Sequence, residues 1–247
     1  MKKRKKKINW ILSIIAIVYI LALVFPQYAF ANKFVYKNFT VYYHAGEADE
    51  EAIKSVLDES MALLKKSVLF NQEKEQRIFV CGSFSEFTFF SPISRKSFAV
   101  NYALLQNIFL SESSFSENRI LRNSDTNNRR TLSAVIAHET THSLLEDKLG
   151  FVKYKLLPSW KNEGYCDHIA QEGSYDEQIG LEEICKGSKD KGSMSFTYFK
   201  YKKYADYLLD VKGVNVEEFL KNDFTLEELD VRLIKAYCDK SSQNESP

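Results

Sequence analysis

The stretch His138-Glu139-Thr140-Thr141-His142 places two of the four histidines of the chain four residues apart. In an α-helix, residues i and i+4 lie one above the other on the same face, about 6 Å apart at Cβ. Two imidazoles at that spacing can bind one zinc ion, and Glu139 lies beside them, next to a bound water. The motif therefore predicts a helix that carries a metal site.

The residues around the motif have the spacing and the end signal of a helix over residues 130–149. Gly150 follows, and glycine commonly ends helices because it adopts left-handed backbone angles without a steric cost. Apolar residues at helical spacing predict the side that packs on the core, namely Leu132, Val135, Ile136, Leu144 and Leu145. The motif histidines are thus expected on a helix with one side in the core.

A second helix is predicted over residues 158–171, because proline, here Pro158, is favoured in the first turn of a helix and glycine, here Gly173, commonly follows the last turn. Twenty residues separate His142 from Glu163, near the start of this helix. A catalytic zinc normally takes three protein ligands and keeps a fourth position for water. A connection of this length can return the second helix across the first, which makes Glu163 the candidate third ligand.

Together with the segment Asn162-Glu163-Gly164, the motif resembles that of the gluzincins, the thermolysin-like and aminopeptidase-like zinc peptidases. In that family an Asn-Glu-Gly or Asn-Glu-Ala segment downstream of the motif carries the third zinc ligand. The resemblance covers residues 98–213 and implies one zinc per chain, with Glu139 as the general base. The ligands that it implies are His138, His142 and Glu163.

The resemblance implies two further roles. In thermolysin-like members an Asp four residues after the ligand Glu orients a zinc-binding histidine, and here that residue is Asp167. Such a carboxylate fixes the tautomer of the imidazole and raises its basicity. An oxyanion needs a hydrogen-bond donor besides the metal, and in gluzincins this donor is often a Tyr or His of the helical part. Tyr198 is the candidate and Tyr201 the alternative, in a run of tyrosines that also fits a packing stripe.

The function that the resemblance implies is hydrolysis of peptide bonds by zinc-activated water, in a peptide or protein substrate. Aminopeptidase relatives carry a glycine-rich Gly-x-Met-Glu-Asn segment before the motif, and this sequence lacks it. An endopeptidase is therefore favoured over an aminopeptidase or a hydrolase of another amide. A catalytically silent binding or regulatory module of the same fold at the cell surface is the other alternative. Glu139 argues against it, because such a module needs no base.

Other acids and histidines near the motif fit the site less well. Glu146 and Asp147 follow the motif by one turn, but they lie too close on the same helix to complete a tetrahedral site. His168 stands five residues after Glu163 and points elsewhere on its helix, so we expect it at the surface or in packing contacts.

The first half of the chain alternates strand-like and helical patterns. Residues 111–130 are polar and predict a long surface loop. The long strand-like stretch 98–110 fits either an ordinary core strand or an edge strand that pairs with an extended peptide. The segments predicted before it are a hairpin or two short strands (34–44), a helix (47–70), a buried strand (77–81) and a helical turn (83–90).

The predicted fold class is α+β: a small mixed β-sheet packed on helices that include the zinc-binding helix, followed by a mostly helical C-terminal lobe. One domain is expected over residues 32–240, with an α/β lobe at 32–155 and a helical lobe at 156–240, and zinc in the cleft between them. The remaining predicted segments are helices at 176–186, 197–212 and 216–237, and a frayed tail at 241–247.

Residues 1–31 have the composition of an export signal. Six basic residues at 2–7 precede the apolar run 8–25, which typically leaves the charged end inside the cell. Ala29-Phe30-Ala31 is a suitable cleavage site for a removable signal peptide. The eighteen residues of the run nearly reach the ~20 that span a bilayer, which favours a retained membrane anchor. Both fates stay open, and both place the rest of the chain outside the cytoplasm.

Charge and cysteine content bear on the binding partners and on the disulfides of the exported part. Removing the six N-terminal basic residues from 34 leaves 28, against 33 acidic residues, so the exported part has a net charge of −5. A chain of that sign offers no broad basic face for nucleic acid.

The cysteines leave several disulfide pairings open. An oxidising compartment permits up to two disulfides, in any of three pairings, among Cys81, Cys166, Cys185 and Cys238. Buried free thiols are the alternative.

Overall fold

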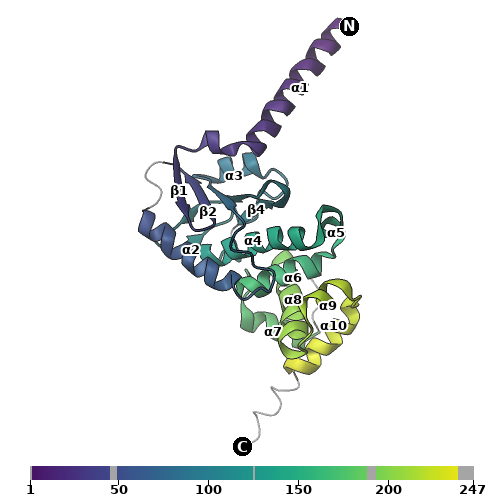
Figure 1. Cartoon of the computed structure of the whole chain (residues 1–247). Coiled ribbons are helices and arrows are strands. Elements are labelled where there is room, and N and C mark those ends of the chain that lie inside the picture. The colour runs from purple at the N-terminus through teal and green to yellow at the C-terminus, as the bar shows by residue number, and fades with distance from the viewer. Residues whose placement is uncertain (1, 45–48, 125, 188–192, 239–247) are drawn as a thin grey trace, which may run out of the picture.

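A computed structural model describes residues 2–44, 49–124, 126–187 and 193–238 (Figure 1). Helix α1 (Lys2–Val24) projects from a body built of a β-sheet and helices. Among the described residues, no helix has both the length and the apolar character needed to cross a membrane. The export signal or anchor at residues 1–31 stays a prediction.

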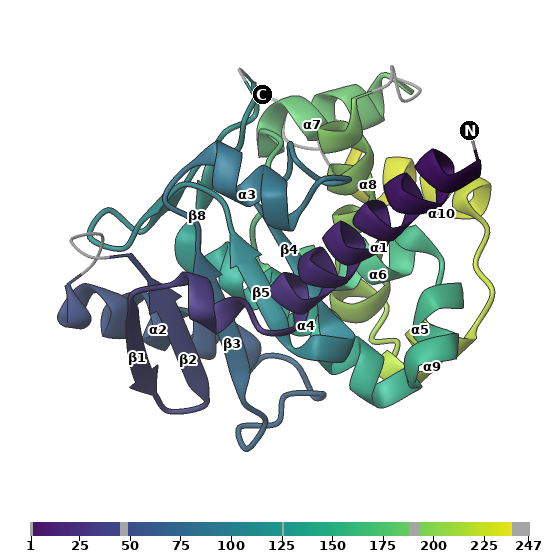
Figure 2. The ribbon, with the colours of Figure 1, turned by 90° about the horizontal axis from the view of Figure 1, so that it is seen from above.

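The body begins with a five-stranded mixed sheet in the order β1-β2-β3-β5-β4 (Figure 2). Strand β1 pairs with β2 and β4 with β5 in antiparallel fashion, while β3 is parallel to both β2 and β5. The predicted hairpin at 34–44, strand at 77–81 and mixed sheet are therefore confirmed. The strands are β1 (Asn32–Tyr36), β2 (Phe39–Tyr43), β3 (Gln76–Val80), β4 (Ala99–Tyr102) and β5 (Asn107–Leu110).

The prediction of a single strand over residues 98–110 was wrong. A short 3-10 helix, η2 (Ala103–Leu105), and a left-handed Gln106 (φ 56°) reverse the chain, so the stretch forms an antiparallel pair, β4 and β5. The Gln106 side chain stabilises this turn, because its Nε2 donates a hydrogen bond to the carbonyl of Ala103 at 2.6 Å. The sequence carries no Gly or Pro at this point to signal the turn.

The stretch 111–130, predicted as a long surface loop, is mostly irregular but also contains three two-residue strands that were not predicted. A second, three-stranded antiparallel sheet lies here, formed by β6 (Ser113–Ser114), β7 (Arg119–Ile120) and β8 (Arg130–Thr131). Asn118 connects this second sheet to helix α4 (Leu132–Leu149): its Oδ1 accepts a hydrogen bond from the backbone N–H of Ser133 at 2.9 Å.

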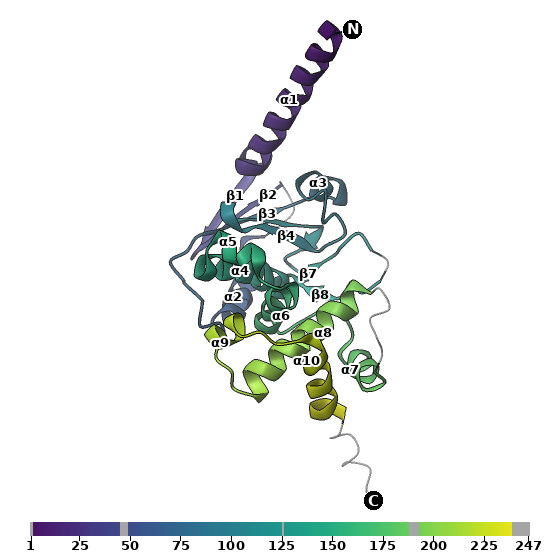
Figure 3. The same cartoon turned by 90° about the vertical axis from the view of Figure 1, so that its right-hand side faces the viewer.

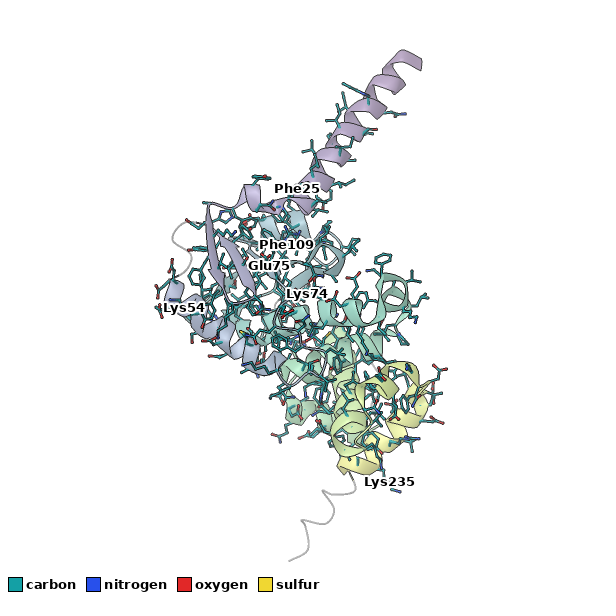
Figure 4. The ribbon with its side chains drawn as sticks, viewed as in Figure 1. Phe25, Lys54, Lys74, Glu75, Phe109 and Lys235 are labelled. Atoms are coloured by element: carbon teal, nitrogen blue, oxygen red, sulfur yellow. A yellow bond between two sulfur atoms is a disulfide. The ribbon has the colours of Figure 1, made fainter. Side chains whose placement is uncertain are left out.

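Helices cover both faces of the five-stranded sheet (Figure 3). Because successive side chains of a strand point to opposite faces, Ile78 and Val80 of β3 pack in the main core with α2 (Glu50–Leu64) and α4 (Leu132–Leu149). Phe79 packs on the opposite face with α3 (Phe84–Phe90) and Phe109. Figure 4 shows Phe109 in the sheet, below the end of α1. The predicted helices at 47–70 and 83–90 are present, the first shorter than expected.

The motif helix α4 matches its prediction closely. The side chain of Thr131 accepts a hydrogen bond from the N–H of Ala134 at the start, and Gly150 (φ 74°) ends the helix. Helix α6 (Ser159–Ala170) ends at a left-handed Gln171 (φ 58°), two residues before the glycine that was expected to end it. A short helix between them, α5 (Phe151–Leu156), was not predicted.

The chain after α6 is helical in every element that the described residues form, as predicted. The stretch 216–237 is divided, because Thr225 accepts a hydrogen bond from the N–H of Glu228 and starts a new helix there. The predicted tail at 241–247 lies outside the described residues. The helices are α7 (Glu177–Cys185), α8 (Met194–Asp206) continued by the π-helix η3 (Tyr207–Val211), α9 (Val216–Lys221), α10 (Leu226–Leu233) and the π-helix η4 (Ile234–Cys238).

One disulfide joins two of these helices. Cys185 at the end of α7 is bonded to Cys238 at the end of η4. Cys81 and Cys166 are buried and form no disulfide with any described residue. The sequence left three ways of pairing the four cysteines open, and the described residues contain the Cys185–Cys238 bond alone.

Close packing of α6 against α8 depends on Gly164. A Cβ atom at residue 164 would overlap the backbone carbonyl of Tyr201 in α8. The glycine of the Asn162-Glu163-Gly164 segment therefore lets α8 approach the helix that carries Glu163.

Candidate metal centre

The motif helix α4 and helix α6 run antiparallel at the centre. Nδ1 of His138 lies 2.7 Å from Oδ1 of Asp167, and Nδ1 of His142 lies 3.0 Å from Oδ1 of Asn162. The later histidine of α4 therefore contacts the earlier residue of α6, which means that the two helices run in opposite directions. Each imidazole is therefore held from behind by a side-chain oxygen of the neighbouring helix.

The other nitrogens of both rings face one carboxylate. Nε2 of His138 lies 3.4 Å from Oε2 of Glu163, and Nε2 of His142 lies 3.9 Å from Oε1. The two rings are 4.9 Å apart between centroids and nearly perpendicular, at 84°. The structure thus brings together the three side chains that the sequence predicted as ligands.

The hydrogen bonds at Nδ1 determine which nitrogen is free to bind a metal. An oxygen that accepts from Nδ1–H keeps that proton in place and leaves the lone pair on Nε2. Both imidazoles are almost fully buried, so water competes little for these bonds. The arrangement is the one that a metal-binding histidine requires.

Buried charges around the imidazoles have shifted pKa values. Burial alone would raise the pKa of Asp167, but Arg130, with its Nη1 at 3.1 Å, and His138 outweigh burial and lower it. Burial would likewise raise the pKa of Glu163, but His142 and His138 have the larger effect and hold this pKa below its usual value. Burial would lower the pKa of His138, but Asp167 and Glu163 have the larger effect and raise this pKa to about 10. Both carboxylates are ionised.

The donor set and the charge of the centre fit a divalent cation. Glu139, Glu163 and Asp167 contribute three carboxylates. Arg130 contributes one positive charge, so with all three carboxylates ionised, and with a cation in place of the second proton of His138, the side chains of the centre carry two negative charges. Two imidazole nitrogens and one carboxylate are a ligand set found at catalytic zinc. The residues present therefore suit zinc in both number and chemistry.

A second ligand set includes Cys166, whose Sγ lies within 4.8 Å of ring nitrogens of His138 and His142. Its Sγ is 3.3 Å from Nδ1 of His142, the atom that also faces Asn162. Cys166 therefore contacts His142 at Nδ1, whereas Glu163 faces Nε2. Burial raises the pKa of its thiol well above the usual value, whereas metals bind the thiolate. The geometry favours Glu163 as the third ligand.

A cavity of about 290 Å³ opens onto this centre and is lined by His138, His142 and Glu163. Glu139 also lines it, and burial raises the pKa of this carboxyl. One wall is strand β4, at the edge of the five-stranded sheet, where Asn101 donates a hydrogen bond to Oγ of Ser143 at 2.9 Å. The edge strand is thus fixed directly to the motif helix.

Of the two tyrosines proposed for the oxyanion, Tyr198 lines the cavity. Tyr201 is not among the lining residues, and its backbone packs against Gly164. Burial raises the pKa of Tyr198 far above its usual value, so its hydroxyl stays protonated and can donate. Tyr154 of α5 lines the cavity as well and was missed, because the short helix that carries it was not predicted.

The remaining candidates lie away from the cavity lining. Asp147 forms an ion pair with Lys74, and Glu146 is buried elsewhere on α4. His168 places its Nδ1 2.9 Å from Oδ1 of Asp206. These two and Asp210 form another cluster of possible metal ligands, but Nζ of Lys202 is 2.8 Å from Asp206 and already supplies a positive charge. The contact of His168 with Asp206 agrees with the packing role expected for this histidine.

Comparison with models of protein families and with curated proteins finds no match to this chain. The assignment of the centre therefore depends on the geometry of the residues themselves.

Replacing Asp167 with Asn should weaken zinc binding about 10- to 100-fold, because His138 loses the carboxylate that orients and polarises its ring. The measurement is a zinc titration of the purified chain against a competing chelator. Asp206→Asn is the matched control, since it removes a similar histidine–aspartate pair outside the cavity and should leave zinc affinity unchanged. Equal zinc affinity in wild type and the Asp167 variant would contradict the role of the Asp167 carboxylate in supporting His138 as a ligand.

Proposed function

We propose that this chain is an exported zinc-dependent peptidase, acting as an endopeptidase on a peptide or protein substrate. The observation that carries this proposal is the convergence of two Nε2 atoms on the Glu163 carboxylate. Both Nδ1 atoms are held from behind by oxygen acceptors, which prepares the rings for a metal. The similarity to gluzincins in the motif and in the Asn162-Glu163-Gly164 segment points to the same chemistry.

The protein's own groups divide the work of hydrolysis among themselves. When bound, zinc would polarise the scissile carbonyl and lower the pKa of water at the site. Glu139 lines the same cavity, and its raised pKa suits a carboxylate that takes a proton from water and returns it to the leaving amine. The hydroxyl of Tyr198, which lines the cavity and stays protonated, would donate to the oxyanion.

An extended peptide is the substrate shape that the cavity wall supports. Strand β4 is at the edge of the sheet, and residues 98–101 line the cavity. An edge strand offers backbone donors and acceptors to a peptide that adds alongside it. The peptide would then lie across the face of α4 that carries Glu139.

Two observations support a location outside the cytoplasm. The basic residues 2–7 and the apolar run 8–25 form an export signal in sequence, either cleaved or retained as a membrane anchor. The Cys185–Cys238 disulfide is of a kind that persists in oxidising compartments. A silent module of this fold, or an aminopeptidase, is the alternative that the following experiments separate.

Glu139→Gln should retain zinc but lower the rate of casein cleavage by about 10²- to 10⁴-fold, because the base is lost. Cleavage is measured by release of soluble peptides, and zinc by metal analysis of the same samples. Glu146→Gln is the matched control on the same helix, since Glu146 is buried but does not line the cavity. Full activity in the Glu139 variant would contradict its role as the base. Inactivity of the zinc-loaded wild type toward casein and peptides would favour the silent module.

Tyr198→Phe should lower kcat by about 10²- to 10³-fold with little change in KM, because the hydroxyl acts on charge that develops in the transition state. Tyr201→Phe is the matched control one helical turn away and should stay near wild-type activity. Steady-state kinetics on one peptide separate the two constants. An unchanged kcat for the Tyr198 variant, with a loss in Tyr154→Phe, would assign the donor to Tyr154 instead.

A further inference from the structure

Arg122 lines the same cavity as the metal centre but has no part in the proposed chemistry. Its Nη2 donates to the carbonyl of Thr126 at 2.9 Å and to Oγ of Ser195 at 3.3 Å. Its guanidinium carbon lies 5.1 Å from the centre of the Phe98 ring, the residue that precedes β4. These contacts hold the guanidinium at the wall of the cavity, and all of them are to neutral groups.

No carboxylate balances this charge among the described residues. Arg130 lies against Asp167 at 3.1 Å, whereas Arg122 forms no ion pair with any acid in the described part of the chain. Nε of Arg122 is buried without a hydrogen-bond partner among those residues. Burial, and then the charge of Arg130, lower the pKa of Arg122. A half-buried positive charge without a counter-charge is unfavourable, so an anion beside it would be stabilised.

The surroundings of Arg122 also suit an anion. Ser195, its hydrogen-bond partner, stands in the first turn of the thirteen-residue helix α8. The N-terminal end of a helix has a partial positive charge. Ser94, Ser97 and Ser174 line the cavity too and add hydroxyl groups. The carboxylates of the cavity, Glu139 and Glu163, belong to the metal centre.

We propose that Arg122 forms a subsite that binds a carboxylate of the substrate, either an acidic side chain or the free carboxyl end of a peptide. The planar guanidinium matches a carboxylate through two parallel hydrogen bonds, and this pairing adds both affinity and orientation. The subsite rests on the proposed function, because the bound carboxylate would place the scissile bond relative to Glu139. It gives the enzyme a preference for acidic or C-terminally free peptides.

Two sets of matched peptides test this subsite on the full, zinc-loaded chain. In the first set, blocked peptides differ by Glu or Gln at one position on either side of the cleaved bond. In the second, the same neutral peptide ends in a free acid or an amide. The carboxylate form should be favoured by about tenfold or more in kcat/KM, mostly through KM. The set that shows the preference identifies the source of the carboxylate.

Arg122→Gln should abolish this preference and Arg122→Lys should retain part of it, because a lysine keeps the charge but not the bidentate geometry. Arg129→Gln is the matched control, since Arg129 is exposed and lies outside the cavity lining. Thermal unfolding checks that each variant folds. Equal kcat/KM for the paired peptides, or a preference that survives in Arg122→Gln, would overturn the subsite.

Binding to the Glu139→Gln variant separates this proposal from the proposed function. Calorimetry with the same peptides measures affinity without turnover, and Arg122 is replaced in that background as well. Tighter binding of the carboxylate forms that depends on Arg122 supports the subsite even if wild type cleaves no peptide, in which case the peptidase proposal fails alone. Equal binding of the paired peptides would overturn the subsite.

Discussion

The hydrogen bonds from Nδ1 of His138 and His142 to side-chain oxygens of α6 fix the direction in which both imidazoles point. Two rings on one helix face have the right spacing for a metal, but spacing alone does not orient them. With Asp167 and Asn162 behind the rings, both Nε2 atoms meet at Glu163, which comes from the same helix as their acceptors. The antiparallel contact of α4 and α6 is thus the constraint on which the candidate centre depends.

The rest of the fold holds these two helices in register. Helix α4 is anchored at its start, where the hydroxyl of Ser60 in α2 donates to the carbonyl of Ser133 at 3.0 Å. Helix α8 packs on the other side of α6 at Gly164, where only hydrogen leaves room for the Tyr201 backbone. Arg130, just before α4, compensates the buried Asp167. A buried ionic network of this kind is strongly destabilised when one partner is lost, so its members are tightly linked.

Sequence reasoning located the centre because its signals are local. The motif spacing and the capping residues around Gly150 predicted α4, and the Asn162-Glu163-Gly164 segment predicted a ligand that the structure brings to the motif histidines. The failures have physical causes. Gln106 reverses the chain without a turn residue, and a six-residue helix gives too short a periodic pattern to detect Tyr154. Arg122 joins the cavity through tertiary contacts, which no local pattern encodes.

Metal analysis of the purified chain tests the central claim most directly. The account predicts one zinc per chain in wild type, loss of zinc in Glu163→Ala, and retention of zinc in Cys166→Ala, because the thiol contacts Nδ1 of His142 and Glu163 faces Nε2. Loss of zinc from the Cys166 variant with full occupancy in the Glu163 variant would assign the third ligand to the thiol and contradict the account. A wild-type chain that binds no zinc would remove its basis entirely.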